Sequence, residues 1–345
     1  MSDDDIETAE APHPRETHVL FGHDEAERSL LDSYRGGRIP HAWLIGGPTG
    51  IGKATLAYRL ARFVLANPDP ALPAVQQATS LAIAPDHPVA RRIANEAHTD
   101  LLALKRVINE KTGKLFTNIR VEDVRRSVSF FGSTAGAGGW RVAIVDTVDE
   151  LEAGGENALL KVLEEPPARS LLLLVSQAPG RVLPTIRSRC RRLLLRPLSE
   201  TDVAKAAAAA IGRPPSGDDI RQAAAAADGS VARTLGLLDG PALLLRQKVI
   251  DLLAQLPAPD PRALHALGDA LGGSEPQTLA TFMDIVNDWL AARLRTGAQE
   301  TAKLARLAQV WEKVNRTARE VEAFNLERKP FVFAVFGLLA EAARW

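Results

Sequence analysis

A glycine-rich loop with one lysine is the first feature of this sequence that predicts chemistry. Its residues are Gly47, Pro48, Thr49, Gly50, Ile51, Gly52 and Lys53. A short apolar run precedes the loop and apolar residues at helical spacing follow it, which is the context that a phosphate-binding loop requires. Backbone N–H groups and a helix N-terminus then face an anion, and the lysine adds a positive charge. The sequence predicts a nucleotide loop, and a glycine-rich turn that binds nothing is the alternative.

The loop lacks the hydroxyl group that normally binds Mg²⁺. The Ser or Thr expected after the lysine is Ala54, and Thr55 stands one position later. A shift of one residue rotates a helical side chain by about 100°, so we do not expect Thr55 to replace it. Mg²⁺ is therefore not expected to be well held, and ATP is expected to bind weakly or not at all.

A second candidate group ends an apolar strand. Asp146 stands where a carboxylate would hold Mg²⁺ through water, and Thr147 occupies the place of the glutamate that would polarise the attacking water. Threonine cannot act as a general base at neutral pH. Asp149 and Glu150 follow, and we interpret them as the solvated start of a helix. Because losing a ligand or a base commonly costs orders of magnitude in rate, we expect no ATP hydrolysis.

A further candidate, Arg189, lies beyond the next apolar strand in Ile186-Arg-Ser-Arg-Cys190. Its guanidinium is permanently charged and forked, which suits a γ-phosphate. A surface arginine near a sheet edge is the alternative, because other arginines crowd it. Upstream, Glu164 and Glu165 end a short helix before two prolines, and we interpret them as structural.

These groups require an α/β domain to position them. Apolar strands alternate with helices, which predicts a mostly parallel sheet covered by helices on both faces. The predicted strands are Trp43–Ile45, Leu101–Leu104, Val142–Val145, Leu171–Val175 and Arg191–Leu195. Predicted helices include Val19–Gly37 and Val121–Phe131.

Composition limits the possible classes. The 345 residues carry 42 Lys and Arg against 42 Asp and Glu, so bulk charge does not argue for a nucleic-acid or membrane partner. The single cysteine, Cys190, excludes an internal disulfide, fits a reducing cytosol and is interpreted as a small buried hydrophobe. His87 and His98 are too few to hold zinc. No apolar run reaches the ~18–20 residues of a membrane span, so we expect a cytoplasmic protein without a membrane partner.

The motifs occur in an order that resembles the clamp-loader branch of the AAA+ ATPases, which includes the γ/τ and δ′ subunits of bacterial DNA polymerase III. The most specific are Asn157-Ala-Leu-Leu-Lys-Val-Leu-Glu-Glu-Pro-Pro167 and Ser188-Arg-Cys190. The resemblance covers about Val19–Leu235. It implies a RecA-like AAA+ domain over residues 19–197, a helical lid over 198–240 and an all-α collar over 241–345, after a disordered tail over 1–18.

The resemblance also implies roles for single residues. Ala54 and Thr147 replace the metal ligand and the catalytic glutamate of the γ/τ type, so the chain is similar to the non-hydrolysing δ′ type. Arg189 would be an arginine finger acting on the ATP of a neighbouring subunit. Arg233 matches the position of the sensor-2 arginine over the nucleotide, and Ser176 the position of sensor 1.

The function that the resemblance implies is loading of a sliding clamp onto primed DNA during replication. The partners would be the γ/τ and δ subunits, with the clamp and primer-template DNA reached through the complex. Direct DNA contact is expected to be minor. Three alternatives are an active AAA+ ATPase of the γ/τ or helicase-loader kind, a small-molecule P-loop kinase, and an interaction module unrelated to replication. ATP turnover, a stable monomer, and co-purification with polymerase III subunits discriminate among them.

Overall fold

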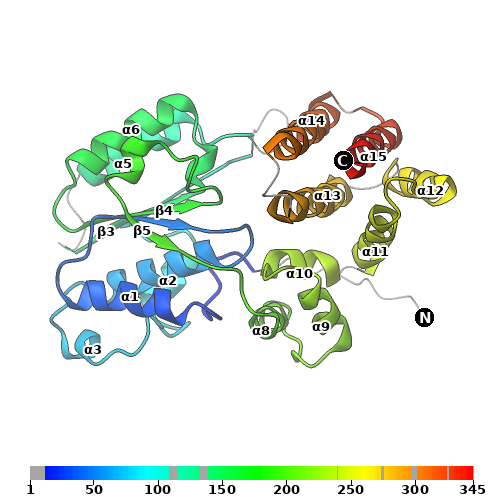
Figure 1. Ribbon diagram of the computed structural model, residues 1–345. Helices are drawn as coiled ribbons and strands as arrows, with labels where there is room; N and C mark the ends of the chain where they lie inside the picture. The colour runs from blue at the N-terminus through cyan, green and yellow to red at the C-terminus, as the bar shows by residue number, and fades with distance from the viewer. Residues whose placement is uncertain are drawn as a thin grey trace. The chain divides into compact units, whose positions relative to one another are not determined.

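The computed structural model describes residues 12–108, 116–132, 139–238, 240–272, 276–296, 301–324 and 326–344. The chain divides into two compact units, one up to Leu235 and the other from Gly236 (Figure 1). The lid predicted over residues 198–240 therefore belongs to the first unit as far as Leu235, and its last residues belong to the second unit. The C-terminal helices form the second unit.

A five-stranded parallel sheet forms the centre of the first unit, with the strand order β2-β3-β4-β1-β5. The strands are β1 (Ala42–Gly46), β2 (Leu101–Lys105), β3 (Arg141–Asp146), β4 (Ser170–Ser176) and β5 (Arg191–Leu194). Each agrees with a predicted strand to within one residue at either end. The predicted parallel sheet is thus confirmed.

Successive residues of each central strand pack on opposite faces of the sheet, because strand side chains alternate. Trp43 and Ile45 join the core under α1 (Asp24–Arg35) and α2 (Lys53–Ala66), while Leu44 joins the core on the other face. That second core is covered by α5 (Val121–Gly132) and α6 (Ala153–Glu164), as Figure 1 shows. Burying one such apolar side chain contributes about 1.5–3 kcal/mol, so both faces stabilise the strands that carry the site.

Shorter elements connect this framework. They are α3 (Pro73–Gln76), α4 (Pro88–Ala94), the 3₁₀ turn η1 (Val148–Glu150) and α7 (Pro184–Arg187). The helices that follow the sheet are α8 (Glu200–Ala210), α9 (Asp218–Ala225) and α10 (Val231–Leu238).

The first helix begins later than the sequence predicted. We expected it from Val19, and it begins at Asp24. Gly22 has φ +69°, and a Cβ there would lie 2.6 Å from Leu198 Cδ2. A backbone in this left-handed conformation cannot continue a right-handed helix, so the helix starts only after the turn.

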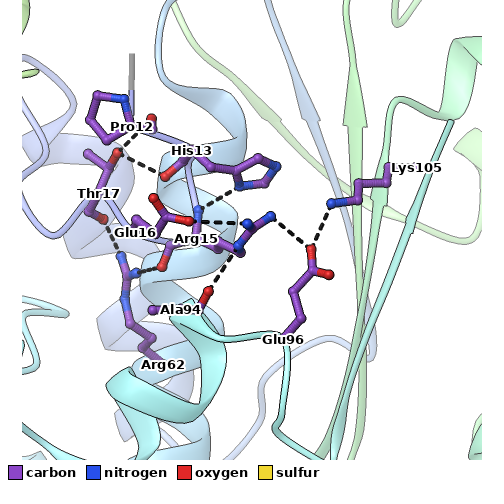
Figure 2. A network of polar contacts seen from close by, with 9 residues as sticks. All are labelled: Pro12, His13, Arg15, Glu16, Thr17, Arg62, Ala94, Glu96 and Lys105. Atoms are coloured by element: carbon purple, nitrogen blue, oxygen red, sulfur yellow. Dashed lines mark hydrogen bonds and ion pairs between the residues drawn. The ribbon is translucent and has the colours of Figure 1, made fainter. Parts of the chain in front are cut away.

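A buried arginine ties the N-terminal segment to the P-loop helix. Arg62 of α2 is 1% exposed, and it donates to the carbonyl oxygens of Arg15, at 2.8 Å, and of Thr17 (Figure 2). Arg15 in turn pairs with Glu96, which also accepts from Lys105. Burial lowers the pKa of Arg62 to about 10. Since a buried guanidinium requires acceptors, the chain from Pro12 to Thr17 is ordered on α2, in contrast to the tail that we expected up to residue 18.

Replacing this guanidinium should destabilise the first unit. Arg62→Met keeps the helix propensity but leaves two carbonyl oxygens without their donor, so we expect a loss of about 1–3 kcal/mol in unfolding free energy. Urea unfolding measures it. Arg28→Met, at an exposed position of α1, is the control and should change stability by less than about 0.5 kcal/mol. Equal effects of the two substitutions would contradict a stabilising role for the Arg62 guanidinium.

The regular secondary structure in the described part of the second unit is helical, as predicted. Its helices are α11 (Gly240–Ala254), α12 (Pro261–Gly272), α13 (Pro276–Thr296), α14 (Thr301–Phe324) and α15 (Arg328–Ala343). Phe282 of α13 packs against Phe331 of α15, with ring centroids 6.1 Å apart, within one apolar core. None of the helices in the described part of the chain is long and apolar enough to cross a membrane.

Candidate functional site

The glycine-rich loop connects β1 directly to α2, as a P-loop must. Gly47, Gly50 and Gly52 have φ values of +151°, +76° and +95°. Side chains other than hydrogen are strained in these conformations, so the three glycines are what allows the loop to bend. The loop ends at Lys53, the first residue of α2, and Ala54 and Thr55 follow in the first turn of that helix. The predicted loop is therefore present as an element of the fold.

Asp146 and Ser176 are the last residues of β3 and β4, so they lie at the carboxyl ends of the strands, where the loop also begins. Gly46 pairs with Ser176, and Asp146 pairs with Val175. Lys53 is only 5% exposed. Burial lowers the pKa of Lys53 to about 8, and the negative charges of Asp146 and Asp149 act in the opposite direction. Burial raises the pKa of Asp146, which Lys53 and Lys105 oppose.

The two carboxylates that follow Thr147 both have partners within the described part of the chain. Thr147 is buried, and Glu150 forms an ion pair with Arg106 at 2.9 Å. Burial raises the pKa of Glu150, while Arg106 and a hydrogen bond from Thr147 oppose that shift. Within the described residues, no group of three or more His, Cys, Asp or Glu side chains is placed to hold a metal ion.

Asp149 has a structural role that the sequence did not reveal. Its carboxylate accepts hydrogen bonds from Ser176 Oγ at 2.8 Å, from Gln177 N at 2.6 Å and from Ala178 N at 3.3 Å. We interpreted Asp149 as part of a solvated helix start, and it is indeed exposed within the 3₁₀ turn η1, but that interpretation missed these three partners. Two consecutive backbone N–H groups after a strand form an anion-binding site, and here the chain's own carboxylate fills it. Only the position of Ser176 at a strand end hinted at such a partner.

The P-loop is bonded to the chain's own groups on several sides. The Lys53 ammonium donates to the Pro48 carbonyl oxygen, and Thr49 Oγ1 donates to Gln177 Oε1 at 3.0 Å. The carbonyl oxygen of Gly50 accepts from Val231 N at 2.9 Å and from Ala232 N at 3.3 Å. These two N–H groups belong to the N-terminus of α10, which is the kind of position that otherwise attracts anions.

Arg233 stands on the same helix. Its Nη1 donates to Asp228 Oδ2 at 3.2 Å, and its side chain is 23% exposed. The structure thus brings the helix of Arg233 to the P-loop through Gly50, and it pairs the guanidinium with Asp228.

Arg189 lies at the opposite side of the sheet from the P-loop, where the strands have their amino ends, just before β5. Its Nη2 lies 2.8 Å from Glu164 Oε1, its Nη1 donates to the Thr185 carbonyl oxygen at 2.9 Å, and its side chain is 36% exposed. We interpreted Glu164 as structural at a helix end, and the structure adds its pairing with Arg189. Cys190 beside it is half-buried against apolar residues, and burial raises its thiol pKa to about 12.

Comparisons with known proteins agree with this arrangement. The family model described as "DNA polymerase III, delta subunit" matches residues 22–199. A DNA polymerase III subunit delta' from Pseudomonas aeruginosa is 37% identical over 165 residues, which cover 47% of this chain and 46% of that protein. The subunit delta' from Escherichia coli is 33% identical over 173 residues, covering 50% and 47%.

More distant similarities extend further along the chain. A subunit tau/gamma from Haemophilus influenzae is 26% identical over 288 residues, covering 80% of this chain and 39% of that protein. A solved gamma subunit-related protein from Thermotoga maritima aligns with 91% of this chain and 99% of its own at 16% identity, with a TM-score of 0.48. The matched segments thus span less than half the length of the curated relatives named here.

The P-loop after β1, the acid that ends β3 and the strand order β2-β3-β4-β1-β5 define a P-loop domain of the AAA+ class. The family match covers more than half of the 345 residues. The chain belongs to the DNA polymerase III delta subunit family.

The charge balance at the P-loop can be measured directly. Lys53 should lose its proton near pH 8, and Asp146→Asn should lower this pKa further, because the negative charge that favours the ammonium is removed. Lysine labelled with ¹³C at Cε gives the titration by NMR. Asp32→Asn on α1 is the control, since Asp32 is not among the charges that act on Lys53. A Lys53 midpoint unchanged by Asp146→Asn would contradict the proximity of the two groups.

Proposed function

We propose that this chain is a δ′-like subunit of the DNA polymerase III clamp loader. In this role it assembles with γ/τ and δ subunits in the cytoplasm and helps to load the sliding clamp onto primed DNA. It supplies Arg189 to the ATP site of a neighbouring subunit and hydrolyses no ATP itself. Its matches to delta' subunits support the subunit type.

The observation that carries this proposal is the place of Arg189 relative to the chain's own P-loop. β1 and β5 are parallel neighbours, paired from Trp43↔Arg191 to Gly46↔Leu194. The P-loop follows the carboxyl end of β1, whereas Arg189 precedes the amino end of β5. About 10 Å of strand separates the two edges, at about 3.3 Å per residue. Arg189 therefore lies away from its own loop, and its partly exposed side chain supports a role at another chain's nucleotide.

The state of the chain's own loop supports the absence of hydrolysis. Ala54 offers no hydroxyl to Mg²⁺, and Thr147 offers no base. The Lys53 ammonium, a donor that a phosphate would use, is already hydrogen-bonded to the Pro48 carbonyl oxygen. ATP must compete with this contact to bind, so we propose weak binding or none, without well-held Mg²⁺ and without zinc. In this proposal Arg233 is a remnant of a lid arginine.

An active γ/τ-like ATPase is the second candidate, because Lys53 and Asp146 are both retained at the P-loop edge. The match to a subunit tau/gamma over 80% of this chain also favours it. The missing groups at positions 54 and 147 argue against it. Turnover by the purified chain decides: a rate approaching ~1 s⁻¹, at the low end for enzymes, would establish the second candidate.

Reconstitution tests the finger. The chain is mixed with γ/τ and δ subunits, and clamp-stimulated ATPase is measured with the unaltered chain and with Arg189→Ala. We expect the site that Arg189 completes to slow by about 10³-fold or more, since it loses a positive charge that stabilises the transition state. Because the assembly holds other ATP sites, single-turnover amplitudes isolate this one.

The matched control is Arg192→Ala. Arg192 is exposed in β5, three residues after Arg189, so its removal changes the net charge equally. It should leave the ATPase unchanged. If Arg189→Ala also changes nothing while the complex still assembles, Arg189 is not a finger.

A further inference from the structure

The carboxylate of Glu164 is the group that faces Arg189. Glu164 Oε1 lies 2.8 Å from Arg189 Nη2, although 25 positions separate the two residues in the sequence. The second contact of the guanidinium is the carbonyl oxygen of Thr185, which is 2.9 Å from Nη1. Two acceptors from different elements therefore hold the two terminal nitrogens of one planar group.

The position of Glu164 at the end of α6 adds to this arrangement. Glu164 is the last residue of that helix, and Arg189 pairs with it there. The C-terminal end of a helix carries a partial negative charge, which stabilises a cation nearby. Arg189 is thus bound at a site of negative charge before any phosphate arrives.

These contacts orient the guanidinium without using all of it. Arginine has five N–H donors, and within the described residues Glu164 and Thr185 engage one on each terminal nitrogen. The remaining donors have the geometry to meet a phosphate, and the guanidinium stays charged beside a carboxylate. A side chain that is 36% exposed would otherwise sample many rotamers, so an orienting partner reduces the entropy lost when the finger engages.

We propose that Glu164 is a positioning residue for Arg189, holding the guanidinium in the orientation that reaches the neighbouring subunit's nucleotide. This inference rests on the proposed function of Arg189. Glu164 touches no nucleotide in this account and acts only through the arginine.

The next residue provides a matched control. Glu165 has the same side chain, is also exposed, and lies outside the helix at its C-cap. Within the part of the chain that the structure describes, it makes no ion pair. Glu164→Gln and Glu165→Gln therefore remove the same charge from adjacent positions, and only the first reduces the ion pair with Arg189 to at most a neutral hydrogen bond.

The test measures single-turnover ATPase of the reconstituted loader with each variant, as a function of ATP concentration. A half-exposed ion pair is worth up to about 1 kcal/mol, so Glu164→Gln should lower kcat at the completed site about two- to fivefold. KM for ATP should not change, because an orienting contact acts in the transition state. Glu165→Gln should match the unaltered chain. In the Arg189→Ala background, Glu164→Gln should have no further effect.

Each other result has a defined meaning. If Arg189→Ala slows the site and Glu164→Gln does not, the positioning role is overturned and the finger stands. If Glu164→Gln raises kcat, the carboxylate competes with phosphate and does not position the arginine. If it lowers kcat equally in the Arg189→Ala background, it acts by another route, which also overturns the inference. If Arg189→Ala itself has no effect, the proposed function fails and this inference with it. Size-exclusion chromatography confirms that every variant assembles.

Discussion

The parallel pairing of β1 with both of its neighbours is the constraint on which the rest of the structure depends. β1 lies between β4 and β5, so its register fixes the P-loop relative to Ser176 on one side and relative to the start of β5 on the other. A slip of one residue would exchange the two faces of the strand and move Trp43 and Leu44 into the wrong cores. The two buried faces therefore hold both edges of the sheet in place.

At the carboxyl edge, backbone donors beside the P-loop are bonded to the protein's own groups. The N–H groups at the start of α10 bond to the Gly50 carbonyl oxygen, and those after β4 bond to the Asp149 carboxylate. Because buried or partly buried donors without partners are costly, these contacts stabilise the loop. The amino edge is different, since within the described part of the chain Arg189 uses only one donor on each terminal nitrogen.

Much of the fold was predictable because its signals are local. Continuous apolar stretches predicted the sheet correctly, and the glycines before Lys53 predicted the loop. Ala54 and Thr147 could be recognised from their positions as departures from the usual P-loop ATPase residues. The start of α1 was placed too early, because the turn at Gly22 depends on its contact with Leu198, which is distant in the sequence.

The contacts of Asp149 and Glu164 were not predictable either. Each carboxylate meets its partner across 25 or more positions, and exposed acids near helix ends look alike in sequence. The ordered conformation of Pro12–Thr17 could not be predicted for the same reason. It depends on a buried arginine whose acceptors lie more than 40 residues away.

The two hydrogen bonds between Gly50 and the start of α10 have a mechanical consequence. The Gly50 carbonyl oxygen accepts from Val231 N at 2.9 Å and from Ala232 N at 3.3 Å, so the P-loop and the helix that carries Arg233 share a backbone contact. A displacement of the loop would break these bonds unless the start of α10 moved with it. The positions of the loop and of the first turn of α10 are therefore mechanically coupled.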